Sequence, residues 1–132
     1  MLYNNEPLLS INNKYPSHLQ VTWLLNTICN FKCVYCKPSL YGGINHGFKW
    51  ENGKRFIEST LQRLDKLKKN SNWAISGGEP TMSPFFPELI DILSKDPRVS
   101  ISISTNGSRS LRYWKKIAHK INGLAFSFHP ET

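Results

Sequence analysis

Three segments of the chain carry apolar residues at the spacing of a helix that buries one face. In residues 52–69 these are Phe56, Ile57, Leu61, Leu64 and Leu67. The positions follow the i, i+4, i+7 rhythm of an amphipathic helix. Residues 82–95 and residues 108–120 repeat that rhythm. We therefore expect three amphipathic helices.

Strand-like segments lie before, between and after these helices. Residues 20–25 and 73–76 are short apolar runs, residues 99–103 alternate with a period of two, and residues 123–129 read as a strand with a polar end. The expected order is βαβαβαβ. Strands that alternate with helices predict an α/β fold with a parallel sheet and right-handed crossovers. In such sheets, ligands bind outside the carboxyl ends of the strands.

All three cysteines lie within eight residues, in the spacing C-x3-C-x2-C, at Cys29, Cys33 and Cys36. Three thiols cannot all pair with one another, and three thiolates on a short loop leave one coordination position open. Such a loop can hold three corners of an iron–sulfur cube. A closed zinc site needs a fourth Cys or His nearby. His46, ten residues past Cys36, keeps zinc open as an alternative.

Polar clusters also follow the three later strands. They are Gly77-Gly78-Glu79-Pro80, Ser104-Thr105-Asn106-Gly107 and the end of residues 123–129, which holds Ser127 and His129. The glycines let a backbone pass close to a ligand, and the proline disfavours helix at the glutamate before it. Each cluster alone has an ordinary reading: a tight turn, an exposed carboxylate, or a helix N-cap, a role that Ser108 is expected to take.

Together, the four motifs resemble those of the radical SAM family. The cysteine loop has Asn after its first cysteine and an aromatic residue before its last, here Asn30 and Tyr35; GGEP, STNG and a fourth-strand serine follow in order. The resemblance implies a parallel βαβαβαβ unit that forms the N-terminal portion of a partial (β/α)6 TIM-like barrel. It also implies a 4Fe-4S cluster held by the three cysteines, with S-adenosyl-L-methionine bound at the open iron.

By the same resemblance, the other motifs bind that cofactor. Backbone carbonyls of the glycine pair would take its amino group, with negative charge from the glutamate nearby. Hydroxyls and an amide of the later motifs would take its carboxylate and ribose. The implied cofactor-binding residues are Tyr35, Gly77, Gly78, Glu79, Pro80, Ser104, Thr105, Asn106 and Ser127. His129 has three open roles: cofactor binding, action on the substrate, or a hydrogen bond at the strand end.

The implied reaction is reductive cleavage of S-adenosylmethionine to methionine and a 5′-deoxyadenosyl radical, which abstracts hydrogen from a substrate. The identity of that substrate is not encoded in any of these motifs. The alternative from another class is a noncatalytic iron–sulfur or zinc module that needs a partner chain. Production of 5′-deoxyadenosine separates the two hypotheses.

Length and composition complete the expectations. We expect an extended leader over residues 1–18 and one core domain over residues 19–132 that stops after its fourth strand. A full (β/α)8 barrel takes roughly 250 residues. The unpaired fourth strand would expose its edge. The favoured explanation for a half barrel is therefore a truncated gene product. The alternatives are a second polypeptide that completes the barrel and two copies that meet edge to edge.

The sequence lacks both a long apolar span and the basic, apolar start of a secretory signal, so a cytoplasmic address and no membrane contact are expected. The net charge is +8. A basic surface suits an acidic electron donor of the flavodoxin or ferredoxin kind. Nucleic acid is disfavoured as a partner, because the lysines spread along helix faces and cluster near helix C-termini, where the dipole alone favours them.

Overall fold

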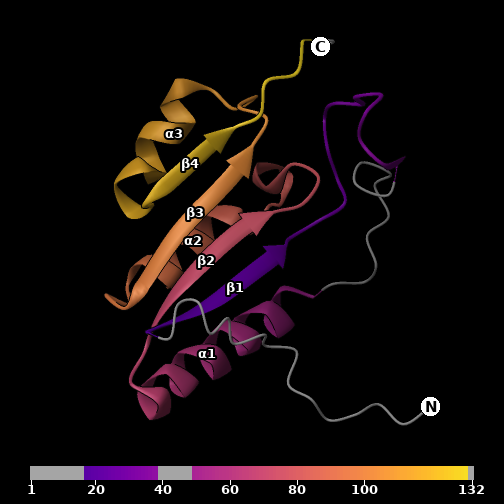
Figure 1. Cartoon of the computed structure of the whole chain (residues 1–132). Helices are drawn as coiled ribbons and strands as arrows, with labels where there is room; N and C mark the ends of the chain where they lie inside the picture. Colours follow the sequence, from indigo (N-terminus) through magenta and orange to yellow (C-terminus); the bar gives the residue numbers. More distant parts are fainter. Residues whose placement is uncertain (1–16, 39–48, 131–132) are drawn as a thin grey trace, which may run out of the picture.

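The computed structural model describes residues 17–38 and 49–130. Its elements are β1 (His18–Leu24), α1 (Trp50–Leu67), β2 (Asn70–Ser76), η2 (Pro80–Met82), α2 (Phe86–Ser94), β3 (Val99–Thr105), α3 (Leu111–Ile117), η3 (Ala118–Lys120) and β4 (Gly123–Phe126). The strands form one parallel sheet in the order β1-β2-β3-β4 (Figure 1). This confirms the α/β fold class and the βαβαβαβ order.

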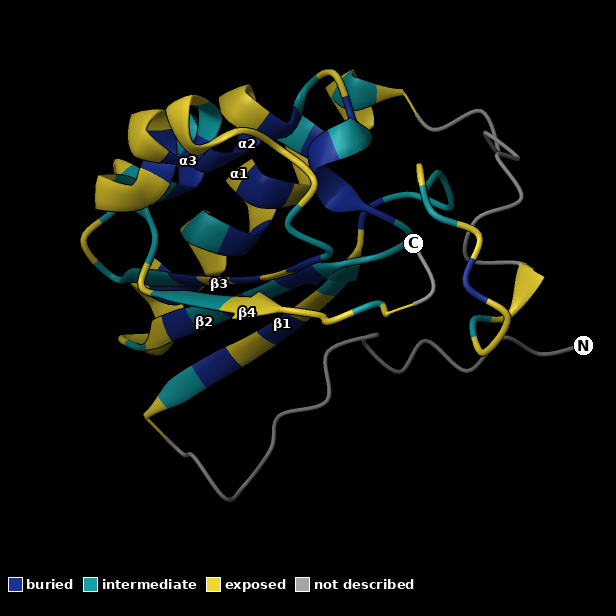
Figure 2. Cartoon of the chain, turned by 90° about the horizontal axis from the view of Figure 1, so that it is seen from above, coloured by how far each residue is buried: buried dark blue, intermediate teal, exposed yellow. Residues whose placement is uncertain are grey.

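The three α-helices cover the same face of the sheet, as Figure 2 shows. Alternate strand residues point toward them and are buried, among them Val21, Trp73 and Ile103. The indole nitrogen of Trp73 donates a hydrogen bond to the Ser71 hydroxyl at 2.9 Å, so its one polar atom is satisfied inside the core. The helices contribute fully buried side chains such as Leu64, and the apolar core lies between the two layers.

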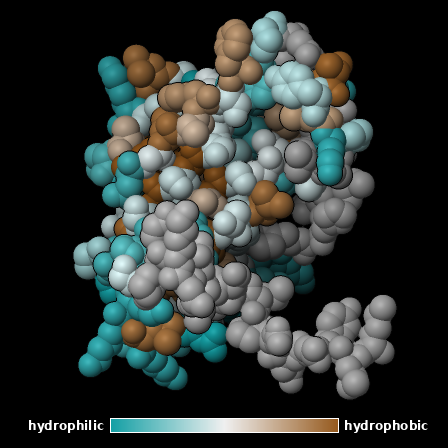
Figure 3. Space-filling view, viewed as in Figure 1, coloured by the Kyte–Doolittle hydropathy of each residue, from teal (hydrophilic) through white to brown (hydrophobic). Residues whose placement is uncertain are grey.

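The opposite face of the sheet carries small and polar side chains. Gln20, Asn72 and Ser100 lie in one register row across the strands, followed by a second row of Thr22, Ala74, Ser102 and Gly123. These residues are half-buried or exposed. Figure 3 shows this side of the molecule, where pale and teal residues stand among brown ones. No described helix packs on this face (Figures 1 and 2).

Prolines and capping residues set helix boundaries that the apolar pattern misplaced. The helix expected over residues 82–95 is split, because Ser83 is extended before Pro84 and α2 begins only at Phe86. The helix expected over residues 108–120 begins at Leu111. Its N-cap is Ser110, whose hydroxyl accepts from the Tyr113 N–H at 3.3 Å, so the expectation for Ser108 is wrong.

The other elements shift by a few residues. α1 runs over Trp50–Leu67 rather than residues 52–69, and Lys68 ends it in the left-handed conformation at φ 50°. β4 ends at Phe126, so Ser127 and His129 lie beyond the strand. The expected leader over residues 1–18 falls outside the described residues except at its end, where His18 begins β1. Within residues 17–38 and 49–130, no helix has the length and apolarity needed to span a bilayer.

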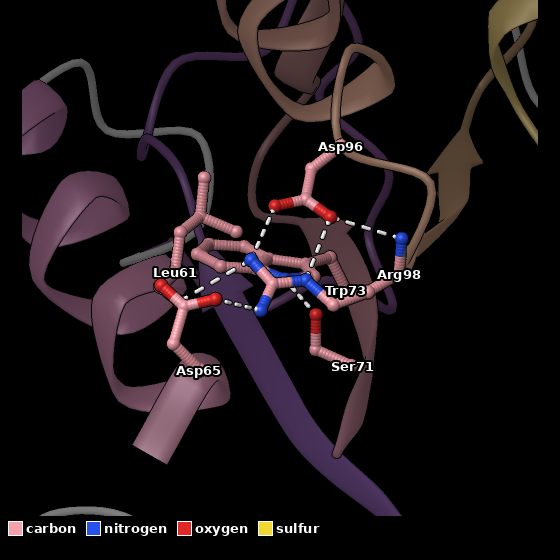
Figure 4. Close-up of polar contacts among 6 residues, drawn as sticks. All are labelled: Leu61, Asp65, Ser71, Trp73, Asp96 and Arg98. Atoms are coloured by element: carbon pink, nitrogen blue, oxygen red, sulfur yellow. Dashed lines mark hydrogen bonds and ion pairs between the residues drawn. The ribbon is translucent and has the colours of Figure 1, made fainter. Parts of the chain in front are cut away.

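An arginine at the amino end of β3 joins three parts of the fold (Figure 4). The Arg98 guanidinium donates to both carboxylate oxygens of Asp96, at 2.7 and 3.0 Å, and to Asp65 of α1 at 2.5 Å. A longer bond of 3.5 Å reaches the Leu61 carbonyl. The side-chain hydrogen bonds from Arg98 lower the pKa of Asp96 below its ordinary value of 3.8. The ionised pair therefore ties the loop before β3 to α1.

We expect the Asp96→Asn chain to be less stable than the wild type at pH 7, by an amount that shrinks below about pH 4. The folded pKa of Asp96 is depressed, so its contribution is present above the unfolded pKa and is lost as the pH falls through the folded one. Urea unfolding midpoints of both chains between pH 7 and pH 3 measure this. A difference that stays constant over the range would contradict a charge-based contribution.

Candidate functional site

One pocket of about 150 Å³ lies at the carboxyl edge of the sheet, where the loops after the four strands meet. Its lining comes from all four motifs picked out in the sequence. The lining residues are Cys29, Phe31, Cys33, Cys36, Ser76, Gly77, Gly78, Ser104, Thr105, Asn106, Ser127 and His129. Of the residues expected in the site, Tyr35, Glu79 and Pro80 do not line it. The expected convergence at this edge of a parallel sheet is therefore present.

Backbone hydrogen bonds fix the cysteine loop against the glycine turn. The Gly78 N–H donates to the Asn26 carbonyl at 2.9 Å, and the Glu79 N–H donates to the Ile28 carbonyl at 2.7 Å. The Asn26 side-chain amide returns a bond of 2.9 Å to the Glu79 carbonyl. These bonds continue the pairing of β1 with β2 beyond the strands. Hence the two loops form one unit.

Gly77 is required by this close approach. Its φ is +142°, a conformation that L side chains rarely adopt. A Cβ at this position would lie 2.6 Å from the Asn26 carbonyl oxygen and 3.0 Å from the Asn26 backbone nitrogen. Within the described chain, the glycine therefore allows close contact with the backbone at the start of the cysteine loop.

Glu79 is fully buried, so the reading of it as an ordinary exposed carboxylate is wrong. One carboxylate oxygen accepts from the Thr81 N–H at 3.2 Å, the Thr81 hydroxyl at 2.5 Å and the Thr105 hydroxyl at 2.8 Å. The other oxygen accepts from the Asn106 N–H at 2.7 Å. The carboxylate therefore connects the glycine turn to the end of β3 and the loop after it.

The loop after β3 also contacts the cysteine loop through Asn106. Its side-chain amide donates to the Asn30 side-chain oxygen at 2.9 Å and lies 3.6 Å from the sulfur of Cys29. The Phe31 N–H donates to the same sulfur at 3.4 Å. The sulfur of Cys29 thus lies beside two N–H groups of the protein.

His129 reaches the cysteine loop from the end of β4. Its Nδ1 lies 3.2 Å from the sulfur of Cys33 and also hydrogen-bonds the Tyr35 hydroxyl. The imidazole stacks on the Tyr35 ring with centroids 5.7 Å apart and meets the Phe31 ring edge-on at 5.7 Å. His129 therefore makes hydrogen bonds just past the end of β4, and its roles in cofactor binding or action on the substrate stay predictions.

The donor set fits an iron–sulfur cluster. None of the three cysteines forms a disulfide, and all three line the same pocket. No trio of His, Cys, Asp or Glu side chains in the described chain is grouped around a single metal position. Thiolates of one cubane bind three different irons, so they need not converge on one point, whereas a zinc ion needs its ligands at about 2.0–2.3 Å from one centre. His46 lies outside the described residues.

The sequence pattern missed two lining residues and one connection. Phe31 lies inside the cysteine motif, between its first two cysteines, and Ser76 is the last residue of β2, directly before the glycine pair; neither was expected to line the site. Adjacency to the cysteines and to the glycine pair was the available signal. No sequence pattern indicated the hydrogen bond between Glu79 and Thr105, since it joins residues 26 positions apart.

Comparisons with known proteins agree with this site. The family model described as radical SAM superfamily matches residues 23–129. A GTP 3′,8-cyclase of Klebsiella pneumoniae subsp. pneumoniae is 32% identical over 92 residues, covering 67% of this chain and 27% of that protein. One from Haemophilus ducreyi is 30% identical over 108 residues, covering 74% and 30%. One from Pasteurella multocida is 26% identical over 118 residues, covering 85% and 33%.

The chain spans between 27% and 33% of the length of these curated relatives. No solved structure matched it. The family match covers the cysteine loop, the glycine turn, the loop after β3 and the residues after β4, which are the same segments that meet at the pocket. The chain therefore belongs to the radical SAM superfamily.

Proposed function

We propose that this chain binds a 4Fe-4S cluster and S-adenosylmethionine and forms the cofactor-binding part of a radical SAM enzyme. The observation that carries the proposal is the meeting of three cysteine side chains, a glycine turn and the ends of β3 and β4 in one pocket. When bound, the cluster and the cofactor together supply a 5′-deoxyadenosyl radical for hydrogen abstraction. Cys29, Cys33 and Cys36 hold the cluster as thiolates.

Two serines are the best-placed side chains for the cofactor's polar groups. The hydroxyl of Thr105 and the side-chain amide of Asn106 already donate hydrogen bonds, to Glu79 and Asn30 respectively. Ser104 and Ser127 also line the pocket, and within the described chain their hydroxyls have no hydrogen bond. They are therefore available to a carboxylate or ribose, while Gly77 and Gly78 offer backbone groups.

The pocket volume bears on how fully this chain alone would enclose the cofactor. About 150 Å³ is below the roughly 300–1,000 Å³ of ordinary small-molecule sites. Further chain, from the same or a second polypeptide, would enclose the cofactor beyond the β4 edge. A reducing compartment such as the cytoplasm suits three cysteines that form no disulfide. The net charge of +8 favours an acidic electron donor. The names of the relatives make GTP the first substrate to test.

The test is anaerobic. The chain is reconstituted with iron and sulfide, reduced with dithionite and mixed with S-adenosylmethionine, and 5′-deoxyadenosine is quantified by mass spectrometry. We expect product from the wild type and none from Cys33→Ala, which removes the most buried of the three thiols. A Lys32→Ala chain, changed at an exposed position of the same loop, is the matched control and should keep the product.

Metal content separates the outcomes. A 4Fe-4S cluster without 5′-deoxyadenosine would favour a noncatalytic module, or a catalytic part that needs further chain. Addition of a full-length relative's remaining segment distinguishes these two. Tightly bound zinc in place of iron, with no product, would contradict the proposal.

A further inference from the structure

The contact between His129 and Cys33 joins two parts of the chain that are 96 residues apart. Cys33 is 3% exposed, whereas Cys29 and Cys36 are half-buried. Water therefore has little access to the Cys33 sulfur as a hydrogen-bond donor. The imidazole of His129 takes that place, with its Nδ1 at 3.2 Å from the sulfur.

The imidazole is held in this orientation by aromatic rings. The Tyr35 ring is nearly parallel to it, with 8° between the planes, and the Phe31 ring is nearly perpendicular, with 82°. Both rings belong to the same cysteine loop as the sulfur. The side chain of His129, which comes from outside the cysteine loop, therefore makes the contact with the Cys33 sulfur.

The chemistry of a bound cysteine fixes which atom donates. A cysteine that ligates iron is a thiolate, which has no proton and only accepts. The contact can persist in the loaded protein only if Nδ1 carries the proton. The Tyr35 hydroxyl lies at the same nitrogen, and with the proton on Nδ1 it becomes a second acceptor that shares the donor.

We propose that His129 is a positioning residue that donates a hydrogen bond from Nδ1 to the Cys33 thiolate and thereby raises the reduction potential of the cluster. The inference rests on the proposed function above. Hydrogen bonds to cluster sulfurs are among the factors that set the potential. The reduced cluster carries one more negative charge, so a donor to the thiolate stabilises it more than the oxidised cluster.

The test measures the potential rather than activity. Wild-type and variant chains are reconstituted anaerobically, and the midpoint of the one-electron reduction is measured by titration with dithionite under electron paramagnetic resonance. We expect His129→Leu to lower the ratio of reduced to oxidised cluster at the wild-type midpoint by about tenfold, which is a shift of about 59 mV for one electron.

A pair of amide variants separates the hydrogen bond from packing. The amide nitrogen of His129→Asn lies near the position of Nδ1, so this chain should keep a potential close to that of the wild type. The amide of His129→Gln is one methylene further out, so this chain should shift as His129→Leu does. The Tyr35→Phe chain keeps the stacked ring and loses the competing hydroxyl, so its potential should stay the same or rise.

Looser packing around the cluster would change the reduction potential in the opposite direction. Water that reaches the cluster stabilises the more charged, reduced form, so a packing defect alone would raise the potential. A cluster in His129→Leu and His129→Gln with unchanged or raised potential would overturn the inference and leave the proposed function intact. A wild-type chain that takes up no iron would contradict the proposed function and the inference with it.

Discussion

Replacing Glu79 with alanine is expected to destabilise the chain by about 4 kcal/mol, since the buried carboxylate accepts four hydrogen bonds. Hydrogen bonds to a charged group contribute roughly 1.5–3 kcal/mol each, and their loss is not additive. The change leaves the Thr105 hydroxyl and the Asn106 N–H without their acceptor. The free energy of unfolding of an ordinary domain is about 5–15 kcal/mol, so this single change would remove a large part of the stability of the chain.

Glu79→Gln gives a graded comparison. It keeps the volume and one accepting oxygen but sets an amide N–H against the Asn106 N–H, so we expect a loss of about 2 kcal/mol. The matched control is Glu58→Ala on the exposed side of α1, expected to change stability by no more than about 0.5 kcal/mol. Urea unfolding of the metal-free chains measures all three. Equal midpoints for Glu79→Ala and Glu58→Ala would rule out the buried carboxylate as a structural connection.

Gly77→Ala is expected to cost about 3 kcal/mol, because the added Cβ meets backbone atoms and the φ of +142° is strained for any L residue. Relief requires Asn26 to move, which breaks its bond from the Gly78 N–H and shifts the start of the cysteine loop. Reconstituted Gly77→Ala should therefore also bind less iron than the wild type. Urea unfolding gives the first effect, and iron content per chain gives the second.

Gly107→Ala is the control for that prediction. Gly107 has a φ of +71°, in the left-handed region, and its Cβ would meet only the ring of Phe126, which is 61% exposed and can move aside. We expect this substitution to lower the free energy of unfolding by about 1 kcal/mol, which is the ordinary cost of placing an L residue in the left-handed conformation. If the two variants proved equally stable, the close approach at Gly77 would have no energetic consequence.

Periodicity was sufficient for the fold but not for its boundaries. The positions of Ile57 and Leu64 predict a helix face, and the alternation from Val99 to Ile103 predicts a strand, because both patterns are local consequences of burying one side. The start of α2 depends on how Pro84 and Pro87 restrict the backbone. Apolar spacing does not record that restriction.

For the site, too, some features could be predicted from the sequence and others could not. The residue types at Cys29, Gly77 and Ser104 identified the pocket because parallel strands bring their carboxyl ends to one edge. The burial of Glu79 and the contact of His129 with Cys33 depend on how separate loops meet in space. No local spacing encodes such a meeting, so those two roles emerged only from the structure.

The small, polar face of the sheet also has a consequence during synthesis. Rows that include Gln20, Asn72 and Ser100 present hydroxyls and amides to water rather than a continuous apolar surface. Chaperones and aggregating partners recognise exposed apolar patches. A chain whose four strands have formed can therefore keep this face hydrated without attracting such partners.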